Sequence, residues 1–180
     1  LTRIMFQSEN AMIVDDALHR IDSVLNLNPL AEAAQPEHPN GASVQLNHVH
    51  FSYDGKNEVI KDISLSIPAG QTVAFVGPSG GGKTTLANLI CRFFDPQDGQ
   101  VKIGGVDVKH IAKEELMNTV SFVFQNSRLI KASILENVRM GKPDATREEI
   151  MAALHNAQCD DILEKLPQGA DTVIGTKGVY

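Results

Sequence analysis

The chain has 180 residues, a length that suits one domain of ordinary size or part of a larger one. Its formal net charge of -6, without any run of basic residues, argues against nucleic acid as a main partner. No segment approaches the ~18 consecutive apolar residues that span a bilayer, and no signal peptide opens the chain, so the chain as given is expected to be soluble. The two cysteines, Cys91 and Cys159, lack metal-ligand spacing and suit a reducing compartment.

The first 41 residues divide into a helix and a linker. Residues 1–28 are predicted to contain an amphipathic helix, because apolar side chains recur at alternating spacings of three and four. These apolar positions are Ala11, Val14, Leu18, Ile21 and Leu25. Such a face needs a partner surface. Residues 29–41 hold three prolines among small and polar residues and are predicted to form an extended linker. The chain begins at Leu1 without Met, which suggests a piece of a longer protein.

Two antiparallel strands are expected next. Val44 and Leu46 alternate with polar residues, the alternation slips near His48, and a turn follows at Asp54-Gly55, which predicts a bulged strand and then a turn. A second alternating run at residues 63–67 predicts its partner strand. His48 and His50 are interpreted as surface residues, because no third metal ligand is near them in the sequence. Three carboxylates of this region are interpreted as solvated charges: Asp54, Glu58 and Asp62.

The most informative motif is the run from Gly77 to Thr84, whose spacing G-x-x-x-x-G-K-[ST] is that of a loop that wraps a triphosphate. Glycines let successive amides approach the phosphates, and the ammonium of Lys83 supplies positive charge toward the β and γ phosphates. The hydroxyl of Thr84 can bind Mg²⁺. A continuous apolar run at residues 73–76 predicts a preceding strand of a parallel sheet, and helical spacing after Lys83 predicts a following helix. The motif therefore has the strand, loop and helix order that phosphate binding requires.

The rest of the chain is predicted to be mostly helical. Residues 101–103 and 120–124 are predicted strands, with a helix at residues 111–117 between them. The patterns Ser133-x-x-Glu136 and Thr146-x-x-Glu149 predict capping boxes that start two helices. A third helix is predicted at residues 161–166, before the turn at Pro167.

Several of these motifs together resemble those of a known family. Tyr53, the loop from Gly77 to Thr85, Phe124-Gln125 and the run Ile134 to Val138 are similar to the nucleotide-binding domain of an ABC transporter of the exporter type, from about Ala42 to the last residue. The resemblance implies an α/β fold. Its expected parts are a P-loop NTPase core, an antiparallel β subdomain and the start of a helical subdomain, in a domain that is incomplete here. It also implies that residues 1–28 extend the last transmembrane helix and that residues 42–180 are the N-terminal portion of the nucleotide-binding domain.

The resemblance assigns roles to the candidate site residues. Lys83 and Gln125 are the implied catalytic residues, and Thr84 and Gln125 the implied ligands of Mg²⁺. Tyr53 would stack on adenine, and Gln125 would be the glutamine of the Q-loop, whose following residues meet the membrane domain. The implied nucleotide-binding residues are Tyr53, Gly77, Pro78, Ser79, Gly80, Gly81, Gly82, Lys83, Thr84 and Thr85.

The implied function is the ATP-binding part of an exporter that couples ATP binding and hydrolysis to substrate movement across a membrane, with ATP and Mg²⁺ as cofactors. The implied partners are a transmembrane domain and a second nucleotide-binding domain, with no nucleic acid. The implied place is the cytoplasmic face of a membrane, with a bacterial inner membrane as the first expectation. The family's signature motif, Walker B strand and switch histidine are not in this sequence, so the chain alone is not expected to turn ATP over. The alternative is a module or degenerate half-site that binds ATP without hydrolysing it.

One local departure concerns the end of the chain. The run Gly175-Thr-Lys-Gly178 stands where the family often has Gly-Glu-Arg-Gly, so one carboxylate that could pair across a domain interface is missing. The resemblance therefore implies ATP binding but not this interface contact.

Overall fold

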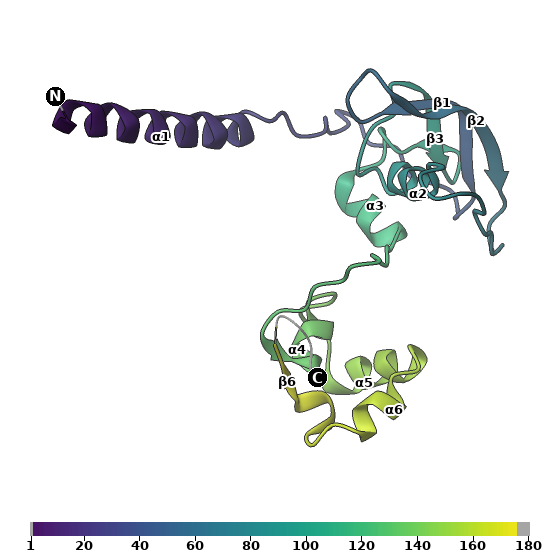
Figure 1. Cartoon of the computed structure of the whole chain (residues 1–180). Coiled ribbons are helices and arrows are strands. Elements are labelled where there is room, and N and C mark those ends of the chain that lie inside the picture. The colour runs from purple at the N-terminus through teal and green to yellow at the C-terminus, as the bar shows by residue number, and fades with distance from the viewer. Residues whose placement is uncertain (1, 176–180) are drawn as a thin grey trace. The chain divides into compact units, whose positions relative to one another are not determined.

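The computed structural model describes residues 2–175, and their side chains from residue 14 on (Figure 1). The chain forms two compact units, divided between Phe122 and Val123, and each is described by itself. Among the described residues, no helix combines the length and the apolar character that crossing a bilayer demands. The run that departs from the family lies, from Thr176 on, outside the described residues.

The first unit begins with the long helix α1 (Thr2–Leu25), where the sequence predicts a helix. Val14, Leu18, Ile21 and Leu25 are all more than half exposed, so the predicted apolar positions are open to solvent in this chain. An apolar row of this kind on a helix is a surface that a partner can cover.

The core of the first unit is built on a four-stranded antiparallel sheet. Its strands are β1 (Val44–Ser52), β2 (Glu58–Ile67), β3 (Asp98–Ile103) and β4 (Val106–Asp107), in the order β2-β1-β3-β4. The helix α2 (Lys83–Ile90) lies against this sheet, with Leu86 and Leu89 buried on it (Figure 1). The sheet contributes Leu46, Val49, Phe51, Ile60, Val101 and Ile103 to the same buried cluster, which Val108, Ile111 and Leu116 complete. Leu116 comes from α3 (Lys113–Thr119), which begins two residues later than the sequence predicts.

The predicted bulge in β1 is confirmed. The pairing of β1 with β2 shifts register between Leu46 and Val49, and His48 adopts a left-handed backbone conformation with φ of 48°. Asp62 on β2 does the same with φ of 49°, and its carboxylate lies 2.7 Å from His48 Nδ1. His50 instead pairs with Glu58 at 2.9 Å, so the two histidines face different carboxylates. Both contacts join β1 to β2 in the hairpin whose turn carries Tyr53.

Two strand predictions are wrong for this structure, that of a parallel-sheet strand at residues 73–76 and that of a strand at residues 120–124. Neither segment is a strand, and the two sheets of residues 2–175 contain only antiparallel pairs. Val76 and Val123 are each 92% exposed. An apolar run takes strand conformation when neighbouring strands accept and donate its backbone hydrogen bonds, and the described residues supply no such neighbour to either run.

Residues 26–43 contain neither helix nor strand, but they are attached to the first unit. The Glu37 N–H donates to the His110 carbonyl at 2.8 Å, and the Asn40 N–H donates to the Gly104 carbonyl at 3.0 Å. Arg92 makes a third attachment, because its guanidinium donates to the Ala31 carbonyl at 2.6 Å. The predicted linker is therefore a bound strap over residues 31–41.

Arg92 also ends α2. Its φ of 52° is left-handed, and the Phe93 N–H bonds the Asn88 carbonyl at 2.9 Å, the pattern of a Schellman cap with arginine in the usual glycine position. The strain of that conformation is offset by the side chain, which is only 8% exposed and also donates to Asp95 at 3.1 Å.

Replacing Arg92 with alanine is expected to destabilise the first unit by about 1–3 kcal/mol, because the Ala31 carbonyl and the Asp95 carboxylate each lose a charged donor. Arg92→Lys keeps the charge but lacks the fork that reaches both partners, so it should recover only part of the loss. Urea unfolding measures the stability, and hydrogen exchange of residues 31–41 reports release of the strap. Unchanged exchange in Arg92→Ala would contradict the attachment.

The second unit is mostly helical. Its elements are β5 (Ala132–Ser133), α4 (Ile134–Arg139), α5 (Arg147–Asn156), α6 (Asp160–Glu164), a 3-10 turn at Gly169–Asp171 and β6 (Val173–Ile174). The full capping box at Thr146 is confirmed, whereas at Ser133 only the Ser133 side chain caps, accepting from the Glu136 N–H. The core of this unit consists of Leu135, Ile150, Leu154, Leu163 and Ala170.

Candidate functional site

The loop between residues 77 and 82 leads directly into α2, which begins at Lys83. Gly80 and Gly82 have φ of 78° and 80°, a conformation that L side chains rarely adopt. A Cβ on Gly82 would lie 2.7 Å from Ile60 Cδ1 and 3.2 Å from the Val59 carbonyl oxygen. Glycine is therefore favoured at Gly82 for two reasons, its left-handed backbone conformation and its close approach to β2. Backbone turns in which right-handed and left-handed residues alternate can direct their N–H groups toward a bound anion.

The side chain of Lys83 spans this loop. Its ammonium Nζ donates to the carbonyls of Gly77 at 2.9 Å and Pro78 at 2.7 Å. The Gly81 N–H closes the loop by donating to the Pro78 carbonyl at 3.1 Å. The loop thus combines one positive charge with the N-terminal end of an eight-residue helix, and both suit a polyphosphate.

Tyr53 lies beside the start of α2. Its hydroxyl is 3.0 Å from Thr85 Oγ1, and its ring meets those of Phe51 and Phe94 edge to face, with centroids 4.8 and 5.2 Å apart. The residue remains 54% exposed. The structure therefore brings the predicted aromatic residue and the predicted phosphate loop together within the first unit.

The loop that carries Tyr53 is held by residues that the sequence analysis missed. Asp54 accepts from the N–H groups of Lys56 and Asn57, both at 2.8 Å, and from the Ser52 hydroxyl at 2.8 Å. Gln97 holds the other side, since its amide both donates to and accepts from the backbone of Ser52. Asp54 is thus more than the solvated charge that we expected. The signal was present in the sequence, because Asp before a glycine-containing turn is typical of side chains that bond the backbone two and three residues on.

These hydrogen bonds predict a pH dependence. The backbone N–H groups of Asn57 and Lys56 hold the pKa of Asp54 far below its usual range. Because the folded pKa is depressed, the contribution of Asp54 to the loop is complete above the unfolded pKa of about 3.9 and is lost as the pH falls through the folded value. We expect the amide NMR signals of Lys56 and Asn57 to titrate with a midpoint well below pH ~3.9, and Asp54→Asn to abolish that titration. A midpoint at or above ~3.9 would contradict the network.

The other three candidate side chains, Thr84, Ser79 and Gln125, are all exposed. Thr84 is exposed next to the buried Thr85, so its hydroxyl is accessible for a ligand. Ser79 is exposed at the outer turn of the loop. Gln125 belongs to the second unit, where it lies exposed at a turn, and its approach to the loop stays a prediction.

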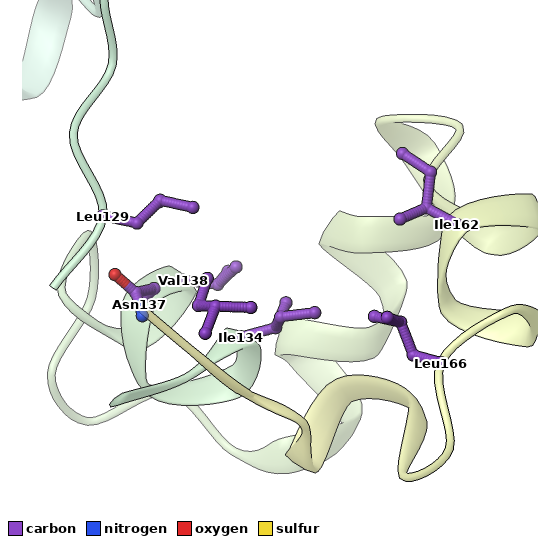
Figure 2. Close-up of a pocket in the computed structure, with 7 residues that line it drawn as sticks. Leu129, Ile134, Asn137, Val138, Ile162 and Leu166 are labelled. Atoms are coloured by element: carbon purple, nitrogen blue, oxygen red, sulfur yellow. The ribbon is translucent and has the colours of Figure 1, made fainter. Parts of the chain in front are cut away.

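The second unit contains an apolar pocket of about 330 Å³. Figure 2 shows its lining side chains, with Ile134 and Val138 of α4 on one side and Ile162 and Leu166 on the other. Asn137 is the polar exception, and it fixes the neighbouring segment, since its amide accepts from the Ile130 N–H at 2.9 Å and donates to the Ile130 carbonyl at 3.2 Å. The segment after Gln125 is therefore held at its far end while Leu129 and Ile130 stay exposed.

Comparison with known proteins shows which family the chain belongs to. Residues 60–177, more than half of the chain, match the family model described as ABC transporter. The chain is 41% identical over 136 residues to an uncharacterized ABC transporter ATP-binding protein of Bacillus subtilis, covering 76% of this chain and 22% of that protein. It is 44% identical over 147 residues to a Staphylococcus aureus protein provisionally named a multidrug export ATP-binding/permease protein, covering 81% of this chain and 25% of that protein.

A comparison with solved structures points to the same family. A bacterial Atm1-family ABC exporter with ATP bound superposes with a TM-score of 0.81 and 34% identity, covering 92% of this chain and 29% of the exporter. The chain belongs to the ABC transporter family. It is similar to ATP-binding parts of exporters and spans about a quarter of the length of the curated relatives that it matches.

Proposed function

We propose that this chain is the ATP-binding part of an ABC exporter-type transporter, which couples ATP binding and hydrolysis to the movement of a substrate across a membrane. The observation that carries the proposal is the glycine loop at the start of α2, spanned by the Lys83 ammonium and adjoined by Tyr53 through the Tyr53–Thr85 hydrogen bond. The loop before α2 thus offers a phosphate cradle, and the turn between β1 and β2 offers an aromatic surface for a base.

The residues have separate tasks in this proposal. The backbone N–H groups of residues 77–85 and the Lys83 ammonium bind the phosphates, which is where electrostatic stabilisation matters most in phosphoryl transfer. Thr84 and Gln125 would hold Mg²⁺, which would supply charge neutralisation at the phosphate oxygens. Gln125 also orients the attacking water through a neutral amide. Tyr53 stacks on the base, an interaction that tolerates different bases.

The transmembrane partner is proposed to meet the second unit. The segment after Gln125 exposes Leu129 and Ile130 beside the apolar pocket, and Asn137 holds its backbone in place. An exposed apolar segment on a fixed backbone is suited to contact with another domain. The open apolar positions of α1 support its proposed continuity with a transmembrane helix, which would place the site at the cytoplasmic face of a membrane.

A second nucleotide-binding domain is the other proposed partner. The whole transporter is then an ATPase only when two such domains complete each other's sites, and this chain alone is not competent for turnover. Closure of the pair is driven by the difference in ATP affinity between the open and closed arrangements.

The test uses the full-length protein in proteoliposomes with magnesium ATP, and measures both nucleotide affinity and phosphate release. The wild type is expected to bind ATP and release phosphate, and Gln125→Ala to keep its ATP affinity while losing most of its turnover, because the amide acts on water and metal rather than on the phosphate chain. The matched control is Asn126→Ala, which removes an exposed amide from the neighbouring position and is expected to retain turnover. Tight ATP binding without phosphate release in the wild type would overturn the hydrolytic part of the proposal.

A further inference from the structure

The side chain of Gln97 takes the place of a strand beside the end of β1. The backbone ladder between β1 and β3 runs as far as the pair of His50 and Asp98, and the Gln97 N–H still bonds the His50 carbonyl at 3.1 Å. The residue before Gln97 is Pro96, which has no N–H to continue such a ladder. At Ser52 the Gln97 amide supplies both hydrogen bonds instead, accepting from the N–H at 2.8 Å and donating to the carbonyl at 2.7 Å.

This pairing acts on the residue directly before Tyr53. Ser52 is only 6% exposed, so its backbone N–H and carbonyl need protein partners. Among neutral side chains, an amide is the group that presents a donor and an acceptor in the arrangement of a peptide unit. Gln97 therefore holds the backbone of β1 at the point where the chain leaves the sheet and enters the turn that carries Tyr53.

The segment that carries Gln97 is itself anchored to the first unit. Asp95 accepts from the guanidinium of Arg92 at 3.1 Å, and the side chain of Arg92 is only 8% exposed. The carbonyl of the buried Pro96 accepts from Lys109 Nζ at 3.4 Å. A side chain on an anchored backbone can hold its partner without further ordering of the protein, which is the advantage of a preorganised site.

We infer that Gln97 is a positioning residue for base recognition, which acts through Ser52 to set where Tyr53 presents its ring to the nucleotide. This inference rests on the proposed function and deepens it, because it names a residue that supports the aromatic surface for the base. The Tyr53 ring meets Phe51 and Phe94, yet the residue is 54% exposed, so packing covers only part of it. The backbone that leads into Tyr53 therefore has a large share in the position of the ring.

The experiment measures the binding of ATP and of inorganic tripolyphosphate, as two probes, to the full-length protein. Gln97→Met keeps the length of the side chain but removes its amide, and Gln97→Glu keeps an acceptor but removes the donor. We expect each variant to weaken ATP binding about threefold to tenfold and to leave tripolyphosphate binding unchanged, because only the base contact depends on Tyr53. The matched control is Gln100→Met, which removes an exposed amide from β3 and should bind both probes as the wild type does.

A Tyr53→Ala background separates positioning from direct contact. Without the ring, Gln97→Met should cause no further loss of ATP affinity, whereas a side chain that touched the nucleotide itself would still weaken binding when replaced.

Three outcomes would overturn the inference: unchanged ATP affinity in both Gln97 variants, an equal loss for tripolyphosphate in both, or an undiminished loss in the Tyr53→Ala background. If thermal unfolding shows that Gln97→Met does not fold, Gln97→Glu carries the test, since it still accepts from the Ser52 N–H. Failure of the proposed function looks different, because the wild type would then bind neither probe.

Discussion

Lys83→Ala is expected to lower the affinity of the full-length protein for ATP by about 100-fold or more and to abolish phosphate release, because the ammonium can bond two phosphate groups by charge-assisted hydrogen bonds. In the structure this ammonium donates to the Gly77 and Pro78 carbonyls, so it lies at the loop and exchanges these two bonds for phosphate oxygens when an anion binds. Titration with a fluorescent ATP analogue measures the affinity.

The matched control for Lys83 is Lys61→Ala. Lys61 is an exposed lysine of β2, and its replacement changes the net charge equally. The variant should keep affinity and turnover near the wild-type values, because the charge of an exposed side chain is screened by salt. Equal losses in the two variants would mean that overall charge, and not the loop, attracts the nucleotide.

The second large effect is expected at Gly82. Gly82→Ala forces a side chain into a left-handed conformation and against Ile60 and the Val59 carbonyl, which should destabilise the first unit by about 2–4 kcal/mol and displace the loop. ATP affinity should fall with it. Urea unfolding and ATP titration measure the two effects.

Gly80 provides the control for this prediction. Its φ of 78° is nearly the same, but a Cβ there has no heavy atom within 4 Å, so Gly80→Ala carries only the conformational cost of about 1–2 kcal/mol. Ile60→Val removes the Cδ1 atom that Gly82→Ala would strike, and the combined variant should recover part of the lost stability. Identical losses at Gly80 and Gly82, with no recovery from Ile60→Val, would show that the contact with β2 is unimportant.

Local features of the fold were predictable where the signal lies in a few adjacent residues. The bulge at His48 is visible in the sequence as a break in the alternation of apolar and polar residues. The cap at Thr146 is visible as a threonine followed three residues later by a glutamate. The helix α2 is visible as apolar residues at helical spacing after Lys83. Each depends on local backbone conformation, which neighbouring residues determine.

The two strands predicted at residues 73–76 and 120–124 are absent from the structure because strand formation does not depend on adjacent residues alone. The apolar runs at residues 73–76 and 120–124 have the composition of buried strands, yet a strand exists only with hydrogen-bonding neighbours, and composition does not provide them. Their exposed valines, Val76 and Val123, remain surfaces that a neighbouring strand could cover.

The candidate site was predictable in its motif but not in its supports. The spacing from Gly77 to Thr84 identifies the loop because each glycine and the lysine have a required chemical task. The contacts of Gln97 and Thr85 with the Tyr53 loop join residues up to 45 positions apart, and no sequence period reports such pairings. The strap attachment of Arg92 to Ala31, 61 positions apart, is of the same kind.

The most direct test of the central claim is an experimental structure of the full-length protein with magnesium and an ATP analogue that resists hydrolysis. The account predicts that the β and γ phosphates lie within the turn of residues 77–85, with Lys83 Nζ turned from the Gly77 and Pro78 carbonyls to the phosphate oxygens and the base against Tyr53. Nucleotide bound elsewhere, with this turn empty and Lys83 still on its own carbonyls, would contradict it.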